Sequence, residues 1–242
     1  MSRAIRARGS LGVLLGVVLW GLAGCQTSPP AAPAPPPPPA APASQTSAAV
    51  PAGARELKVV SEESLLQVLV YRGGAMARLG HNHVIASHQL TGSVYLGDDL
   101  AATRFDISFR VNGLTVDEPA LREAAGPDFL PAVPQSAREG THANLLSEPL
   151  LDGVRFPTIR LRATDVMPTA NSYQATVEIT LKDQTHLVTI PVQVERSDGQ
   201  LIASGEFPLR QSELGLKPFS IAMGALVVLD QMQVRFRVTA RQ

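Results

Sequence analysis

Two histidines separated by one residue, His81 and His83, are the side chains of this chain best suited to chemistry. In an extended strand over 77–85, residues two apart point to the same face, so their rings would lie about 7 Å apart. Neutral imidazole is a ligand for zinc, copper or iron. The pair could therefore share a metal, with His88, His142 or His186 as a third ligand.

Two other interpretations of this pair compete with the metal. The rings could cap the anionic head group of a ligand, or they could hydrogen-bond backbone carbonyls near Gly73 and Gly74 and fix a tight bend. Two histidines without a nearby carboxylate are a weak metal signal. We therefore assign neither a metal nor another cofactor, and keep His81 and His83 as candidate head-group or metal residues.

Signatures of other chemistries are missing from the sequence. It contains no Gly-x-Ser-x-Gly elbow and no phosphate-binding glycine loop, and Asp230 looks like a strand residue near an end of the sheet. The 21 basic and 21 acidic residues cancel, so no basic field is available for nucleic acid. The single cysteine excludes an internal disulfide and a multi-cysteine zinc site. We expect neither enzymatic activity nor a nucleic-acid partner.

The N-terminus has the three parts of a signal peptide. Arg3, Arg6 and Arg8 form a positive region, and an apolar run over 11–20 follows, too short to span a bilayer comfortably. We expect residues 1–24 to be this signal peptide.

The next residues, Leu22-Ala23-Gly24-Cys25, resemble the lipobox of bacterial lipoprotein precursors. The resemblance implies that Cys25 receives a diacylglycerol, that the chain is cut before it, and that a further fatty acid such as palmitate is added. Several acyl chains together give stable anchoring. Gln26, rather than Asp, follows the cysteine, which favours the outer membrane, facing the periplasm.

A second boundary follows from composition. No charged residue occurs between Arg8 and Arg55, and ten of the 20 prolines lie between Pro29 and Pro51. Such a segment cannot form a core, and polyproline II stretches at about 3.1 Å per residue. We expect a disordered tether over 25–55 and one folded domain over 56–242.

Period-two alternation of apolar and polar residues dominates this domain, as over 105–111, 173–181 and 227–240. One apolar and one polar face per strand is typical of antiparallel sheets. Helical patterns occur only over 119–125 and 135–146, between two groups of strands. The sequence predicts an all-β, antiparallel up-and-down barrel with one or two short helices in a central insertion.

A barrel of about eight strands holds either packed side chains or one small ligand. The only tryptophan, Trp20, lies in the expected signal peptide, and the chain has three tyrosines and seven phenylalanines. Large side chains that could fill the interior are therefore scarce. The barrel is either narrow and full or encloses an apolar cavity.

Four segments, in this order, resemble the YceI-like family of bacterial periplasmic proteins: 104–117 (RFDISFRVNGLTVD), 142–163, 175–194 and 205–238. The resemblance covers nearly the whole domain. It implies a lipocalin-like barrel with a long apolar cavity that binds a polyisoprenoid or related amphiphilic lipid. The inward positions of the matching strands are then the candidate lipid-binding residues, with ordinary core packing as the alternative for each: Phe105, Ile107, Phe109, Tyr173, Val177, Ile179, Phe207, Met232, Val234 and Phe236.

The resulting hypothesis is an envelope lipoprotein, held in the membrane through acylated Cys25, whose barrel binds a long-chain isoprenoid or fatty lipid. The first alternative is a metal- or redox-linked periplasmic module that uses His81 and His83. The second is a structural lipoprotein with a filled barrel.

Overall fold

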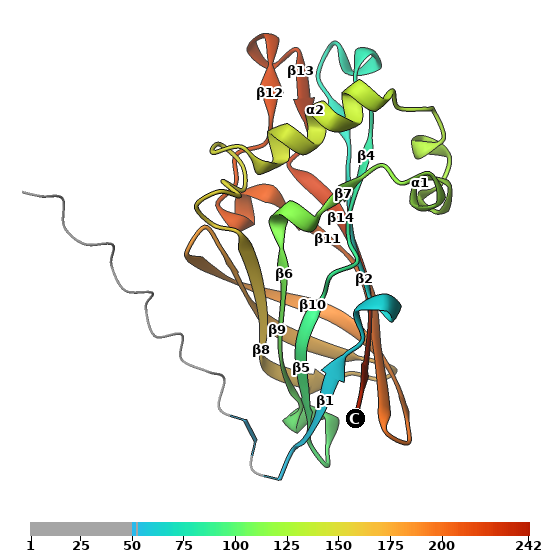
Figure 1. Cartoon of the computed structure of the whole chain (residues 1–242), viewed down its shortest axis with the longest axis vertical. Helices are drawn as coiled ribbons and strands as arrows, with labels where there is room; N and C mark the ends of the chain where they lie inside the picture. The colour runs from blue at the N-terminus through green and yellow to red at the C-terminus, as the bar shows by residue number, and fades with distance from the viewer. Residues whose placement is uncertain (1–49, 52) are drawn as a thin grey trace, which may run out of the picture. The chain divides into compact units, whose positions relative to one another are not determined.

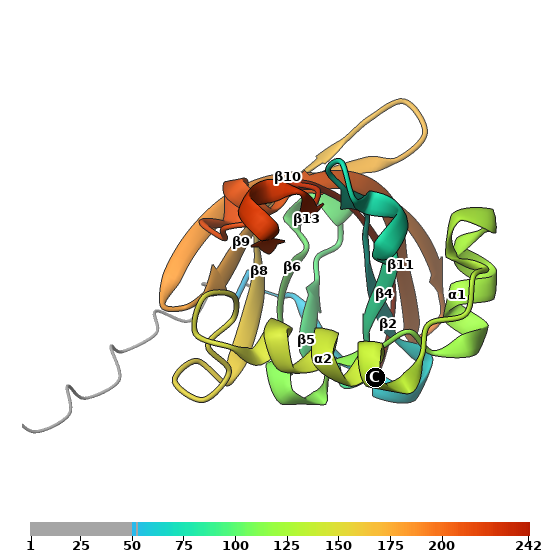
Figure 2. The ribbon, with the colours of Figure 1, turned by 90° about the horizontal axis from the view of Figure 1, so that it is seen from above.

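Residues 50–51 and 53–242 are described by a computed structural model. The expected signal peptide, the expected anchor at Cys25 and most of the expected tether lie outside these described residues. Eight antiparallel strands form a ring that the pairing of the first with the last closes (Figures 1 and 2). The predicted barrel fold is thus confirmed. In ring order the strands are β1 (Arg55–Val59), β5 (Thr91–Leu96), β6 (Arg104–Arg110), β8 (Thr158–Pro168), β9 (Tyr173–Leu181), β10 (Gln184–Ser197), β11 (Gln200–Arg210) and β14 (Gln231–Arg241).

The first strand of the ring is followed by a turn, and three further short strands extend the barrel wall on one side. After the turn at Ser61–Glu63, β2 (Leu65–Val70) pairs with the first half of β14, next to where β1 pairs with its end. β2 also pairs with β4 (His83–Ser87), and β4 pairs with β7 (Thr115–Val116). This extension brings the segment that begins at His83 beside the segment that ends at Val116.

A small second sheet lies beyond the end of the barrel at which β14 begins. It consists of β12 (Ser220–Ile221), β13 (Leu226–Val228) and β3 (Arg72–Gly73). Gly74, which follows β3, has φ +88°, and a Cβ there would lie 2.5 Å from the carbonyl oxygen of Ala225. Only glycine permits this backbone and this close approach.

Two α-helices have the bounds that the sequence predicts: α1 (Pro119–Ala125) and α2 (Gln135–Leu146). Pro119 occupies the first turn of α1, where its missing N–H costs nothing, and Gly126 with φ +105° ends this helix. α2 packs beside β7 and lies across the end of the barrel that carries β12 and β13 (Figures 1 and 2). In the described part of the chain, no helix has the length and apolar character needed to cross a bilayer.

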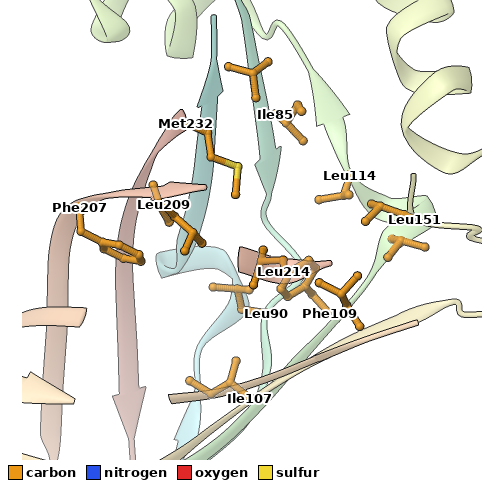
Figure 3. Close-up of a cluster of buried hydrophobic side chains, with 14 of the residues drawn as sticks. Ile85, Leu90, Ile107, Phe109, Leu114, Leu151, Phe207, Leu209, Leu214 and Met232 are labelled. Carbon is orange, nitrogen blue, oxygen red and sulfur yellow. The ribbon is translucent and has the colours of Figure 1, made fainter. Parts of the chain in front are cut away.

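The alternating strand residues turn their apolar side chains to the barrel interior. Figure 3 shows such side chains from several strands and loops converging on a common region, among them Ile107, Phe109, Leu209 and Met232. Each buried side chain of this size stabilises the fold by about 1.5–3 kcal/mol. The interior surface therefore both stabilises the barrel and defines its chemistry.

Two strand predictions were wrong at their ends. The strand expected over 77–85 begins only at His83, because Ala77–Leu79 forms a 3₁₀ turn. The last strand breaks before β14, where the Leu229 N–H donates to the Tyr71 carbonyl at 2.7 Å. Asp230 consequently leaves the strand and accepts hydrogen bonds from the N–H and hydroxyl of Ser212, at 2.8 and 2.6 Å.

Candidate functional site

The barrel encloses a cavity of about 400 Å³, within the range of roughly 300–1,000 Å³ usual for small-molecule sites. Of the two structures that the sequence left open, the full barrel is therefore wrong and the hollow one is correct. All ten predicted wall residues line this cavity: Phe105, Ile107, Phe109, Tyr173, Val177, Ile179, Phe207, Met232, Val234 and Phe236.

The cavity wall is almost entirely apolar. Its phenylalanines pack on one another as well as facing the open space, since Phe207 and Phe236 meet edge to face with ring centres 6.4 Å apart. Among the described residues that line the cavity, Arg72 is the only Lys or Arg, and Asp and Glu are absent. The wall is therefore suited to a hydrocarbon chain and unsuited to a charged group along its length.

Five polar lining residues lie at the end of the cavity near α2. We call this group the polar mouth: Arg72, His81, His83, Thr141 and Asn144. The His81 and His83 ring centres lie 6.1 Å apart, close to the spacing expected for a shared face. Thr141 and Asn144 are three residues apart on α2 and so share one helix face.

His83 is held by a buried carboxylate. Its Nδ1 lies 2.6 Å from Oδ2 of Asp117, whose side chain is fully buried. The other oxygen of Asp117 accepts from the Val84 N–H at 2.9 Å and from the Arg122 guanidinium. Burial alone would raise the pKa of Asp117, but hydrogen bonds from His83, Val84 and Arg122 outweigh it and hold the pKa below its usual value. Asp117 is therefore ionised and fixes the position of His83.

Strand pairing explains why these distant residues meet. The register pairs Ile85 with Val116, so Asp117 follows β7 at the level of Val84. The Asp117 N–H donates to the Val84 carbonyl at 2.8 Å, while the Val84 N–H donates to the Asp117 side chain. Asp117 adopts φ +57°, a left-handed conformation that aspartate tolerates better than most residues.

The ionised carboxylate also sets the hydrogen bonding of the His83 ring. Nδ1 carries the proton that Asp117 accepts, so in the neutral ring Nε2 is an acceptor, 3.3 Å from the Thr141 hydroxyl. A hydroxyl, an imidazole and a carboxylate in this order resemble an acyl-transfer relay, which also needs donors aimed at an oxyanion. The buried guanidinium of Arg122 does not serve this purpose, because it is bound by Asp117 and by the carbonyls of Asn82 and Pro131. The arrangement orients His83 at the mouth.

His81 faces the cavity with less support. Burial lowers its pKa, and electrostatic interactions with His83, Arg122 and Arg72 lower it further. His81 is thus neutral at pH 7 and offers the mouth one donor and one acceptor. Arg72 donates to the Gly80 carbonyl through one nitrogen, which places its guanidinium beside His81.

The structure corrects the earlier interpretations of the histidines. A carboxylate, Asp117, does lie beside His83, and the ring bonds side chains rather than backbone carbonyls near Gly73 and Gly74. His88 pairs instead with Glu118 at 2.9 Å. Within the described residues, no three His, Cys, Asp or Glu side chains form a metal-binding group, so a third ligand from His88, His142 or His186 is not brought to the pair.

Three residues of the polar mouth, Arg72, Thr141 and Asn144, were not predicted from the sequence, and neither was the pair of Asp117 and Arg122 that supports it. The segment LTVD, which ends at Asp117, carried the one available signal, an aspartate directly after a short strand. The sequence near Arg122 and Thr141 carries no comparable signal, because both residues lie within the two helices of the insertion.

A closed antiparallel barrel with an apolar cavity and a polar mouth places the chain in the class of small hydrophobic-ligand barrels. The family of YceI-like domains matches residues 75–240, and the chain belongs to this family. Arg72, β1 and β2 lie outside the matched range.

One solved structure agrees at the level of the fold, and a second is a weaker likeness. BcnA of Burkholderia cenocepacia is 15% identical, with a TM-score of 0.56, and the match covers 75% of this chain and 99% of that one. The YceI protein of Campylobacter jejuni is 8% identical, with a TM-score of 0.45, over 64% of this chain and 81% of that one. No curated protein matches the sequence.

Proposed function

We propose that the barrel binds a long-chain isoprenoid or other amphiphilic lipid, with the chain in the cavity and the head group at the polar mouth. The observation that carries the proposal is the hollow, apolar cavity of about 400 Å³ with one polar end. Each buried methylene contributes about 0.8 kcal/mol, so about ten of them contribute some 8 kcal/mol before the cost of ordering the chain.

The mouth limits the kind of head group. Arg72 is its one permanent charge, and His81 is neutral at pH 7. An anionic head group or a hydrogen-bond acceptor such as a carbonyl fits these donors. A cationic head group does not, because the carboxylate nearest the mouth, Asp117, is already bound by Arg122 and His83.

The expected location completes the proposal. Acylated Cys25 would anchor the protein in the cell envelope, in the outer membrane facing the periplasm, with the segment to residue 55 as a tether. Replacing Cys25 with Ser should remove the attached fatty acid and reduce the share of the protein in the membrane fraction. Membrane association that survives this substitution unchanged, with no fatty acid on the wild-type protein, would overturn the anchor.

A chain-length series tests the cavity. Ala203 on β11 lines the cavity at the level of Val238, away from the mouth, whereas its neighbour Ser204 is not among the lining residues. Ala203→Phe should fill this part of the cavity and shorten the longest fatty acid or polyprenyl alcohol that delipidated protein takes up. Ser204→Phe adds the same ring to the alternate face and should leave the length limit unchanged.

The two variants separate ligand binding from folding. Thermal unfolding of both reports any loss of stability, so a stable Ala203→Phe protein with a shorter limit supports the cavity as the binding site. The same length limit in wild type and both stable variants, or no uptake by any of them, contradicts the proposal.

A further inference from the structure

Exposed apolar side chains gather on two neighbouring loops beyond the polar mouth. We call the group the apolar tip: Met76, Leu79, Ile221 and Met223. Leu79 is 61% exposed, and Met223 is fully exposed. Large apolar side chains pointing into water in one place commonly mark an interaction surface.

The two loops form one fixed unit, although about 145 residues separate them. The Met76 N–H donates to the Ala225 carbonyl at 2.7 Å, and β13 pairs with β3 directly below. Gly74 permits the close approach of the two backbones. Figure 1 shows the loops side by side above the end of the barrel. The apolar tip is therefore a defined feature of the fold.

The tip continues into the cavity. Gly80, Phe219 and Leu226 belong to the same two segments, and all three line the cavity. Each of the two segments thus carries exposed apolar side chains at the tip and also residues that line the cavity.

The charged residues of the two segments that carry the tip have one sign. The segments 72–80 and 215–229 contain Arg72, Arg78 and Lys217 and no Asp or Glu. Apolar side chains at the end of a protrusion, with cations behind them, are the composition of segments that enter the interface of an anionic bilayer. A protein partner would not require this combination with an opening into a lipid-sized cavity.

We propose that the apolar tip docks on the surface of an anionic lipid bilayer, with Met223 and Ile221 in the interface and the cavity mouth at the membrane. Docking holds whether or not a lipid occupies the cavity, so it goes beyond the proposed ligand binding. Where both hold, the tip gives a lipid a path into the barrel that avoids water.

A single tryptophan can report the docking. Residues 50–242 form a closed barrel with its own core, and this segment contains no tryptophan, since Trp20 is the only one. In this segment, Met223→Trp should shift its emission to shorter wavelength when vesicles of phosphatidylcholine and phosphatidylglycerol are added. The matched control is Met167→Trp, because Met167 is also exposed but lies by the β8–β9 hairpin, near the barrel end where β14 finishes at Arg241. It should not shift.

Equal responses of the two tryptophans to vesicles, or no response of either, would overturn the proposal. A shift of Met223→Trp that follows protein concentration without vesicles would also overturn it, because the tip would then cover a second copy. Phosphatidylcholine alone should give a weaker shift than the anionic mixture, and an equal shift would contradict the role of Arg78 and Lys217.

A second variant tests docking on vesicles without the introduced tryptophan. Replacing both Ile221 and Met223 with Asp should reduce sedimentation with anionic vesicles about tenfold or more, whereas Met167→Asp should leave it unchanged. Uptake of a fatty acid supplied in detergent should survive the double substitution if the cavity binds lipid. Loss of docking with retained uptake, and loss of uptake with retained docking, therefore distinguish the two proposals.

Discussion

The cavity wall and the polar mouth are built in different ways. The wall consists of residues two apart on continuous strands, each contributing one apolar side chain, as Ile107 and Phe109 do on β6. The mouth depends on one buried group, Asp117, that joins β4, β7, α1 and the ring of His83. A wall made of many equivalent contacts should tolerate conservative change, whereas a mouth centred on a single carboxylate should not.

Removing that carboxylate should have the largest effect. In Asp117→Ala, the Arg122 guanidinium stays buried without its ion-pair partner, and breaking a buried pair in this way costs about 3–5 kcal/mol. Urea unfolding of the variant measures the loss. The control is Glu63→Ala, which breaks the exposed pair with Arg241 and should cost no more than about 1 kcal/mol. Equal losses of unfolding free energy in the two variants would contradict the difference between the buried pair at the mouth and an exposed surface pair.

Acid should weaken the same interaction in the unmutated protein. The resulting loss of unfolding free energy should not exceed the loss caused by Asp117→Ala. The pKa of Asp117 is lowered in the folded state, so its contribution to stability is complete above the unfolded value of about 3.9 and disappears as the pH falls through the lower folded value. The free energy of unfolding should thus fall more steeply in this acid range for wild type than for Asp117→Asn. Parallel pH profiles would show that Asp117 is not ionised in the fold.

Two histidines that each pair with a carboxylate, one at the mouth and one on the surface, should show a smaller difference of the same kind. The His83 side chain is 12% exposed and that of His88 is 47% exposed. His83→Gln weakens a hydrogen bond to a buried charge and should cost roughly 2 kcal/mol, whereas His88→Gln should stay within about 0.5 kcal/mol. Thermal unfolding of the two variants measures both losses of stability. A larger loss for His88 would mean that exposure does not control the value of these contacts.

The wall should show the smallest change. Phe207→Leu loses the edge-to-face contact with Phe236 and should cost about 0.5–1.5 kcal/mol. Because leucine keeps the lining apolar, lipid uptake should persist. A loss of uptake as severe as that of a mouth variant would show that the wall recognises its ligand through specific residues.

The same difference explains what the sequence could predict. Alternation marks inward positions locally and the family resemblance selected the strands, and all ten predicted wall residues line the cavity. Helix signals near Pro119 and Gln135 placed both helices. Asp117 lies 34 residues from His83, and only the pairing of β4 with β7 joins them. Local pattern carries no information about that pairing. The break before β14 was missed for a similar reason, since it depends on contacts of Leu229 and Asp230 with Tyr71 and Ser212.

Native mass spectrometry of the purified barrel domain, before and after incubation with a polyprenyl alcohol and a fatty acid, would show lipid binding without any variant. A lipid-binding barrel should carry a non-covalent adduct of one long-chain lipid, either co-purified or acquired on incubation. Protein that carries no lipid on purification and takes up neither probe, while remaining folded, would contradict lipid binding by the barrel.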